Sequence, residues 1–213
     1  MVEPFIDQAI DIENQNAIAA GEPFVLEEYN AYRFWQKGGE ITAGTILGLS
    51  MGGLFGVVFA YSRDSLPGSN NKKKALVLAA VMLVVLYIVP VLKYPANPPA
   101  VGDPETIYVR ETLYIALLAI SGFSALGLAF LYRKLGKNQA KKVVVPAIYI
   151  GIIAAAFVAL PPNPDEITAP MDLVTSFRIA SGFTMIVFWA LLGIILGAFW
   201  DKTKPHETAR ISV

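Results

Sequence analysis

The sequence predicts an all-α fold, namely a polytopic α-helical membrane protein with five transmembrane helices. Apolar residues make up 55% of its 213 residues, whereas charged residues make up only 16%. The charges avoid five stretches that are long enough to cross a bilayer, for which a helix needs about 20 residues. Backbone groups in lipid must be hydrogen-bonded within the segment, and no alternation of polar and apolar residues indicates a barrel. A soluble core of five buried helices is the alternative interpretation.

This pattern divides the chain into three segments. Residues 1–40 form an acidic extracytoplasmic N-terminal segment, residues 41–200 a five-helix transmembrane domain, and residues 201–213 a cytoplasmic tail. The N-terminal segment carries aromatic residues that are typical of a membrane interface. These are Phe24, Tyr29, Tyr32, Phe34 and Trp35. The five spans are expected over residues 41–61, 75–93, 111–132, 143–160 and 173–199.

Basic residues indicate the orientation in the membrane. They concentrate after the first and third spans and in the tail, at Arg63, Lys72, Lys73, Lys74, Arg133, Lys134, Lys137, Lys141, Lys142, Lys202, Lys204 and Arg210. The opposite side carries only Arg33, Lys37, Lys93 and Arg110, together with all acidic residues except Asp64, Asp201 and Glu207. Because Lys and Arg are enriched in cytoplasmic loops, we expect a multi-pass protein of the cell membrane with its N-terminus outside and its C-terminus in the cytoplasm.

The first span carries glycine at every fourth position. Gly44, Gly48, Gly52 and Gly56 therefore fall close to one side of the predicted helix, which we call the glycine face. Small residues at this spacing let another helix approach closely, and in lipid such contact replaces the hydrophobic drive of water. Either another helix of this chain or a partner subunit can occupy the glycine face. The run Gly193-Ile-Ile-Leu-Gly197 repeats the spacing once in the last span.

A short signature recurs in the third and fifth spans, as Ser121-Gly-Phe-Ser124 and Ser181-Gly-Phe-Thr184. Spans two and three then match spans four and five, and both pairs run outward and back. This arrangement predicts a parallel repeat of two helical hairpins related by an axis along the membrane normal. Chance similarity between glycine-rich membrane helices is the alternative interpretation.

Two proline-rich acidic connections, which we call the elbows, separate spans on the outer side. The first elbow reads Tyr94-Pro-Ala-Asn-Pro-Pro-Ala-Val-Gly-Asp-Pro-Glu105, and the second reads Leu160-Pro-Pro-Asn-Pro-Asp-Glu166. Proline fixes its own backbone and biases the preceding residue away from helix, so it ends the second and fourth spans and stiffens the loop after each of them. The plain interpretation is that both elbows are rigid loops.

The elbows also contain oxygen ligands for a metal ion. The candidates are Asn97, Asp103 and Glu105 in the first elbow and Asn163, Asp165 and Glu166 in the second. If the hairpins form a repeat, these carboxylates and amide carbonyls converge near its axis. Oxygen ligands suit hard or borderline divalent cations, and an acidic vestibule raises the local cation concentration. The residue types do not distinguish cobalt from magnesium, manganese or nickel.

Arg178 is expected inside the fifth span. A charge at that depth is costly and normally faces the bundle in a pair. We expect Arg178 to pair with Glu111, at the start of the third span, or with Asp172. Such an intramembrane pair either stabilises the helix bundle or takes part in gating.

Several function classes are excluded by what the sequence lacks. It has no cysteine, and its single histidine, His206, lies in the polar tail. It contains no Walker loop, no dinucleotide fingerprint and no His-Glu-x-x-His motif. We therefore expect a protein that is not an enzyme, holds no permanent cofactor and binds no nucleic acid, with the lipid bilayer as its surroundings.

Three motifs carry a resemblance to a known family. They are Leu92-Lys-Tyr-Pro-Ala-Asn-Pro-Pro-Ala-Val-Gly-Asp-Pro-Glu-Thr106, Arg178-Ile-Ala-Ser-Gly182 and Phe188-Trp-Ala-Leu-Leu-Gly193. With them the chain resembles the predicted cobalt transporter subunit family CbtA, from about Gly38 to Trp200. The resemblance implies a small multi-pass subunit of a cobalt uptake system linked to cobalamin supply, with Co²⁺ as the transported ion. It also implies a small single-helix, His-containing membrane subunit (CbtB-like) as a partner, which the glycine face would accommodate.

The N-terminus departs from the family's pattern. Many members carry one more membrane helix before the segment that matches Pro4-Phe-Ile-Asp-Gln8, where this chain begins. Either the start is misassigned or the chain is a five-helix variant.

The sequence supports two hypotheses for the function. The first is a membrane subunit of a cobalt (divalent cation) transporter, in which cations are admitted near the elbows. The second is a non-transporting structural subunit that scaffolds a larger membrane complex and uses the elbows as rigid contacts.

Overall fold

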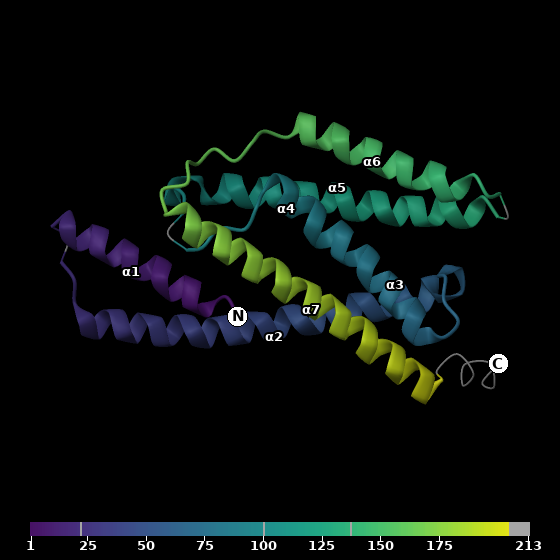
Figure 1. Cartoon of the computed structure of the whole chain (residues 1–213), viewed down its shortest axis with the longest axis horizontal. Helices are drawn as coiled ribbons and strands as arrows, with labels where there is room; N and C mark the ends of the chain where they lie inside the picture. The colour runs from purple at the N-terminus through teal and green to yellow at the C-terminus, as the bar shows by residue number, and fades with distance from the viewer. Residues whose placement is uncertain (22, 100, 137, 205–213) are drawn as a thin grey trace. The chain divides into compact units, whose positions relative to one another are not determined.

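The computed structural model describes residues 1–21, 23–99, 101–136 and 138–204 (Figure 1). These residues form helices and loops with no strand among them, so the predicted all-α fold is confirmed. The α-helices are α1 (Glu3–Ala19), α2 (Leu26–Ser62), α3 (Asn71–Leu83), α4 (Val89–Lys93), α5 (Ile107–Lys134), α6 (Lys141–Ala159) and α7 (Met171–Thr203). Short 3₁₀ or π turns are η1 (Arg63–Ser65), η2 (Val84–Ile88) and η3 (Pro104–Thr106).

Five of the described helical segments are long and apolar enough to span a membrane, as the sequence predicts. They are Leu26–Ser65, Asn71–Lys93, Pro104–Lys134, Lys141–Ala159 and Met171–Thr203. Large apolar side chains on them are exposed, among them Leu49, Phe123 and Val158. Apolar surface of this extent is costly in water and stable against lipid, which agrees with a multi-pass membrane protein.

Helix α2 begins well before the predicted first span. The sequence predicts a span over residues 41–61, whereas α2 runs from Leu26 to Ser62 over 37 residues. At about 1.5 Å per residue such a helix is about 55 Å long, whereas the hydrocarbon core of a bilayer is about 30 Å thick. A hydropathy pattern detects only the apolar part of a helix that lipid can cover. The first turns of α2 carry charged residues, so the sequence alone does not distinguish them from a loop. The predicted interfacial aromatics from Tyr29 to Trp35 lie on those turns.

The chain divides into two compact units. Unit 1 comprises Met1–Val2 and Ala80–Trp189, and unit 2 comprises Glu3–Ala79 and the residues from Ala190 onward. Both elbows, and the ends of the helices that lead into them, belong to unit 1. The glycine face belongs to unit 2.

In unit 2, a cluster of ion pairs holds α1 against α2. Arg33 on α2 is only 7% exposed, and its Nη2 contacts the carboxylates of Asp7 and Glu3, the latter at 3.3 Å. Lys37, one turn further along α2, lies 2.9 Å from Glu3 Oε1. A buried guanidinium needs carboxylate partners to offset its lost hydration. These contacts therefore fix the α1–α2 hairpin.

Unit 2 also distinguishes the two glycine motifs. A Cβ added at Gly193 of α7 would lie 3.1 Å from Ala79 Cβ, and one at Gly197 would lie 2.5 Å from Lys72 Cα, both on α3. A Cβ added at any of the four residues of the glycine face has no atom within 4 Å in this unit. The short motif of α7 therefore mediates a helix contact within the chain, whereas the glycine face of α2 is open within its unit.

In unit 1, α5 and α6 lie side by side and run in opposite directions (Figure 1). A buried cluster of Tyr94, Leu117 and Ala156 joins the end of α4 to α5 and α6. The first elbow begins at Tyr94, and Leu160, which packs against the same cluster, begins the second. This small core therefore fixes the starting points of both elbows.

The helical segment that leads to the first elbow contains one π turn, η2. There the N–H of Val89 bonds to the carbonyl of Val84, five residues earlier. In the same register the carbonyl of Val85 would accept from residue 90, but Pro90 has no N–H. Ser121 on α5 is fully buried and donates its hydroxyl proton to this carbonyl at 2.5 Å.

Ser121 belongs to the signature that recurs at Ser181. Because the Ser121 proton goes to a backbone carbonyl, the hydroxyl of Tyr149, 2.7 Å away, donates to Ser121 in turn. Ser181 is partly exposed, so the two serines occupy different environments. The predicted hairpins thus differ at their shared signature, and their relation as a parallel repeat stays a prediction.

Candidate functional site

The two elbows are hydrogen-bonded to each other at their bases. Lys93, the last residue of α4, donates to the carbonyl of Phe157 at 2.7 Å. Tyr94 donates to the carbonyl of Pro161 at 2.6 Å. Burial raises the pKa of Tyr94, so its hydroxyl keeps the proton that it donates. Both acceptors lie at or just beyond the end of α6, where carbonyls have no intrahelical N–H partner.

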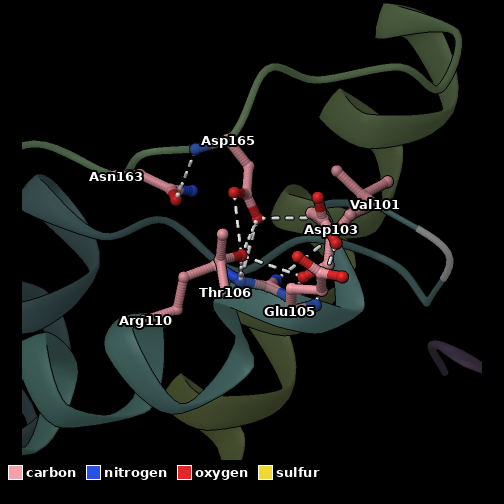
Figure 2. Close-up of polar contacts among 7 residues, drawn as sticks. All are labelled: Val101, Asp103, Glu105, Thr106, Arg110, Asn163 and Asp165. Atoms are coloured by element: carbon pink, nitrogen blue, oxygen red, sulfur yellow. Dashed lines mark hydrogen bonds and ion pairs between the residues drawn. The ribbon is translucent and has the colours of Figure 1, made fainter.

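One carboxylate connects the elbows at their acidic ends (Figure 2). The side chain of Asp165 in the second elbow is only 8% exposed and lies 2.9 Å from Arg110 Nε in the first turn of α5. Its oxygens are also 2.8 Å from the hydroxyl of Thr106, and one accepts from the backbone N–H of Asp103 at 3.1 Å. Charge-assisted hydrogen bonds of this kind stabilise a buried carboxylate. Asp165 therefore links the two elbows through its side chain.

The first elbow is shaped to present these donors. The side chain of Asp103 accepts from the N–H of Glu105 at 2.8 Å and so caps the turn η3. Gly102 has a φ of +103°, and a Cβ there would lie 2.7 Å from Arg110 Nη1 and would also contact Asp165. Glycine is required at this position by both the left-handed backbone and the close approach of the ion pair.

A cavity of about 330 Å³ lies between the end of α4, the first turns of α5 and the two elbows. Its lining consists of Tyr87, Val91, Tyr94, Pro95, Ala96, Asn97, Arg110, Leu113, Tyr114 and Asn163. Both elbow asparagines therefore line one space. None of the described lining residues is acidic.

The amide oxygens of both asparagines are already hydrogen-bonded. Asn97 Oδ1 accepts from Arg178 Nη2 at 2.7 Å, and Asn163 Oδ1 accepts from the N–H of Asp165 at 3.2 Å. Neither donor can accept a hydrogen bond, so the orientation of both amides follows from their partners. The ends that remain for a ligand are the two amide NH₂ groups.

Arg178 has partners other than the expected carboxylates. Its Nε donates to the carbonyl of Ala96 at 3.1 Å, and its Nη2 donates to Asn97. Glu111 and Asp172 are exposed, and within the described part of the chain neither forms an ion pair with Arg178. The elbow supplies the acceptors instead, because its proline-rich backbone has carbonyls that no helix uses.

The predicted cation ligands do not assemble into a cluster. Asp103, Glu105 and Glu166 are exposed, whereas Asp165 is buried in its ion pair. In the ranges that the structure covers, no group of three or more Asp, Glu, His or Cys side chains is placed to hold a metal ion. The elbows therefore present an acidic surface, and metal binding by these residues and by Asn97 and Asn163 stays a prediction.

Arg110 and Thr106, which hold Asp165, are not among the predicted site residues. One sequence signal could have identified them: they lie four residues apart at the start of a helix, so they share one face directly beside the first elbow. In the sequence, Arg110 appears only as one of the few basic residues on the acidic side.

A comparison with known proteins identifies the family of this chain. A family model described as "Probable cobalt transporter subunit (CbtA)" matches residues 1–201. No curated protein and no solved structure matches the chain. The match agrees with the resemblance carried by the first elbow and with five membrane-spanning helices, and it concerns a class of transporter subunits rather than of enzymes. The chain is therefore a multi-pass membrane protein that belongs to the CbtA family of probable cobalt transporter subunits.

Proposed function

We propose that this subunit admits Co²⁺, or another divalent cation, at the joined elbows on the outer side of the membrane. Membership of the family supports the transport function. The observation that supports the elbows as the entrance is the charge that they present. Asp103, Glu105 and Glu166 are exposed on two elbows that Asp165 ties together.

The exposed carboxylates would attract cations from solution by long-range electrostatic forces. Negative charge at the mouth of a path raises the local concentration of cations and their rate of arrival. Because the described acidic side chains form no cluster for a metal ion, they would hold a hydrated cation only weakly. Weak binding suits an entrance, which must release the ion inward.

The orientation in this proposal rests on the distribution of basic residues. The connections after the first and third spans and the tail carry most of the Lys and Arg residues, which favours their placement in the cytoplasm. The N-terminus and both elbows then lie outside, and the C-terminus lies in the cytoplasm.

We further propose that a small single-helix, His-containing membrane subunit docks on the glycine face. The open glycine face of unit 2 supports this partner, since small residues let a helix approach closely in lipid. The chain has one histidine, His206, which lies outside the described residues. Imidazole is a favourable ligand for late first-row metals, so a partner with histidines would supply a ligand type that is scarce here.

The test of the entrance is the uptake of labelled Co²⁺ by cells that lack other cobalt importers. The elbow variant Asp103→Asn/Glu105→Gln/Glu166→Gln removes the exposed charges and retains Asp165, so the elbows stay joined. The control variant Glu13→Gln/Glu27→Gln/Glu28→Gln removes the same number of exposed charges from α1 and α2. At subsaturating Co²⁺ we expect the initial rate to fall about tenfold in the elbow variant and to stay unchanged in the control.

Equal uptake by the two variants, at equal amounts of protein in the membrane, would rule out the elbow entrance and leave the family assignment intact. A non-transporting scaffold predicts a different pattern. In that case cells that carry the elbow variant take up Co²⁺ normally through the larger complex, and they lose uptake only when Gly48→Leu prevents copurification of the partner.

A further inference from the structure

We propose that the cavity between the elbows, α4 and α5 binds an oxyanion, namely a phosphate or carboxylate group carried by a lipid headgroup or by a small soluble molecule. This site is distinct from the cation entrance and does not rest on it. The cavity measures about 330 Å³. One water occupies about 30 Å³ of liquid, so the space accommodates an oxyanion together with the atoms attached to it.

Hydrogen bonds around the cavity leave donors for a ligand. The amide oxygens of Asn97 and Asn163 are bonded to Arg178 and to the N–H of Asp165, so both amides present NH₂ groups. The guanidinium of Arg110, which also lines the cavity, has five N–H groups. Nε, Nη1 and Nη2 each donate one to the protein, which leaves one further N–H on each Nη. Donors of this kind match the lone pairs of an oxyanion and cannot coordinate a metal.

The charged residue in the lining of the cavity is a cation, Arg110, and two further cations, Arg178 and Lys93, bond to oxygens of neighbouring segments. Arg110 is balanced by Asp165. Arg178 donates to a backbone carbonyl and to Asn97, and Lys93 donates to the carbonyl of Phe157, so the partners of these two cations are neutral. Both are partly buried, and within the described ranges neither has a carboxylate at ion-pair distance. Among the charged residues that line the cavity or hydrogen-bond to its asparagines, Arg110 and Arg178 outnumber Asp165, so this inner layer carries a net positive charge. Asp103, Glu105 and Glu166, in contrast, are exposed and do not line the cavity.

A partly buried cation with only neutral partners retains much of its desolvation cost. An oxyanion in the cavity would offset that cost through charge-assisted hydrogen bonds to the amides and to Arg110. The apolar side chains of Val91 and Leu113 in the lining lower the local dielectric constant and so strengthen the attraction. A bare divalent cation in the same space would meet donors and like charge.

The experiment measures ligand binding to the purified full chain in neutral detergent, from the shift in unfolding temperature and by native mass spectrometry. Inorganic phosphate and citrate are the soluble probes, with sodium chloride at matched ionic strength as their control. Phosphatidylglycerol is the lipid probe, with phosphatidylcholine as its control, and cobalt chloride tests the opposite ligand class.

The key variant is Asn97→Asp. It keeps an oxygen for Arg178 to donate to, and it replaces the free NH₂ by a negatively charged oxygen, so it should fold at least as stably as the wild type. Asn163→Asp makes the same change on the second elbow. Glu166→Gln is the control, because Glu166 is exposed on the same elbow and does not line the cavity.

We expect saturable binding of an oxyanion to the wild type and to Glu166→Gln, and a loss of about tenfold or more in affinity in both aspartate variants. Binding of phosphate or citrate would identify a soluble ligand, whereas binding of phosphatidylglycerol alone would identify a lipid headgroup, and either result supports the proposal. Three outcomes would overturn it: no saturable binding of any anion, equal anion affinity in the wild type and both aspartate variants, or stabilisation of the wild type by cobalt chloride alone.

Discussion

Arg110 and Asp165 form an ion pair at 2.9 Å between the first turn of α5 and the second elbow. The whole of α6 separates these two residues along the chain. The same carboxylate also accepts from the backbone of Asp103 in the first elbow, so one side chain joins three segments of unit 1. The shape of the elbows therefore depends on this pair as well as on the prolines.

Asp165→Asn should weaken the link between the elbows. The amide cannot match the charge of Arg110 and leaves a partly buried guanidinium without its anion. Loss of one partner of a buried ion pair costs about 3–5 kcal/mol, and because Arg110 is 26% exposed we expect about 2 kcal/mol here. Thermal unfolding of the purified protein in detergent measures the change. The exposed neighbour Glu166→Gln should shift stability by no more than about 0.5 kcal/mol, and equal effects of the two changes would refute the structural role of Asp165.

Gly102→Ala should destabilise the first elbow for two reasons. Its φ of +103° is unfavourable for alanine, and the added Cβ would displace Arg110 and Asp165. Strained backbone positions of this kind cost about 1–3 kcal/mol, and the displaced ion pair adds to that cost. Gly136→Ala is the matched control, since Gly136 also has a positive φ, of +56°, but no atom lies within 4 Å of the added Cβ. If the two alanine variants unfold at the same temperature, the close approach at Gly102 contributes nothing.

Ser121→Ala should leave the carbonyl of Val85 without a donor. A buried unsatisfied polar group costs about 1–3 kcal/mol, and the missing N–H of Pro90 prevents the helix from supplying a replacement. We therefore expect Pro90→Ala to be less harmful, or even favourable, in the Ser121→Ala background than in the wild type. A double-mutant cycle of unfolding free energies measures this coupling. Strictly additive effects would show that Val85 does not connect the two residues.

The two glycine motifs should respond differently to leucine. Gly197→Leu should destabilise the chain itself, because the added side chain meets the backbone of Lys72 on α3. Gly48→Leu lies on the open glycine face, so the isolated chain should unfold as the wild type does, while any helix that docks there should be lost. Thermal unfolding reports the first effect and copurification from mild detergent the second. A Gly48→Leu chain that is itself destabilised would place another helix of this chain on the glycine face.

The number of spans follows from hydropathy, because the energy of burying a segment in lipid is set mainly by its own apolar residues. The start of α2 could not be found in that way, since its first turns around Arg33 are held by Glu3 and Asp7 of α1 and not by lipid. The glycine spacing in α2 and in α7 looks alike in the sequence. The glycines of α7 contact a neighbouring helix because α3 lies beside them, and the place of α3 cannot be derived from the spacing of glycines in one sequence.

Within the elbows, the sequence indicates which residues could bind a ligand but not which of them already have hydrogen-bond or ion-pair partners. Asn97 and Asn163 line one cavity, and both are candidates from their residue type and their place in the elbows. Residue types alone do not reveal that their oxygens are already bonded, or that Asp165 has a guanidinium beside it. The same holds for Arg178, because its charge predicts an acidic partner, whereas its actual acceptors include a backbone carbonyl of the first elbow.

Helix α2 exceeds the thickness of the hydrocarbon core by roughly 25 Å, from lengths of about 55 and 30 Å. Its charged first turns, which are paired with α1, are the part of the helix that suits the headgroup region or the surrounding water. The chain has no native cysteine, so one introduced at an exposed position such as Glu28 is the sole target for a thiol reagent that cannot cross membranes. Labelling of intact cells at that one position would report on which side of the membrane the first turn of α2 lies, without a fusion partner and without background from other thiols of the printed sequence.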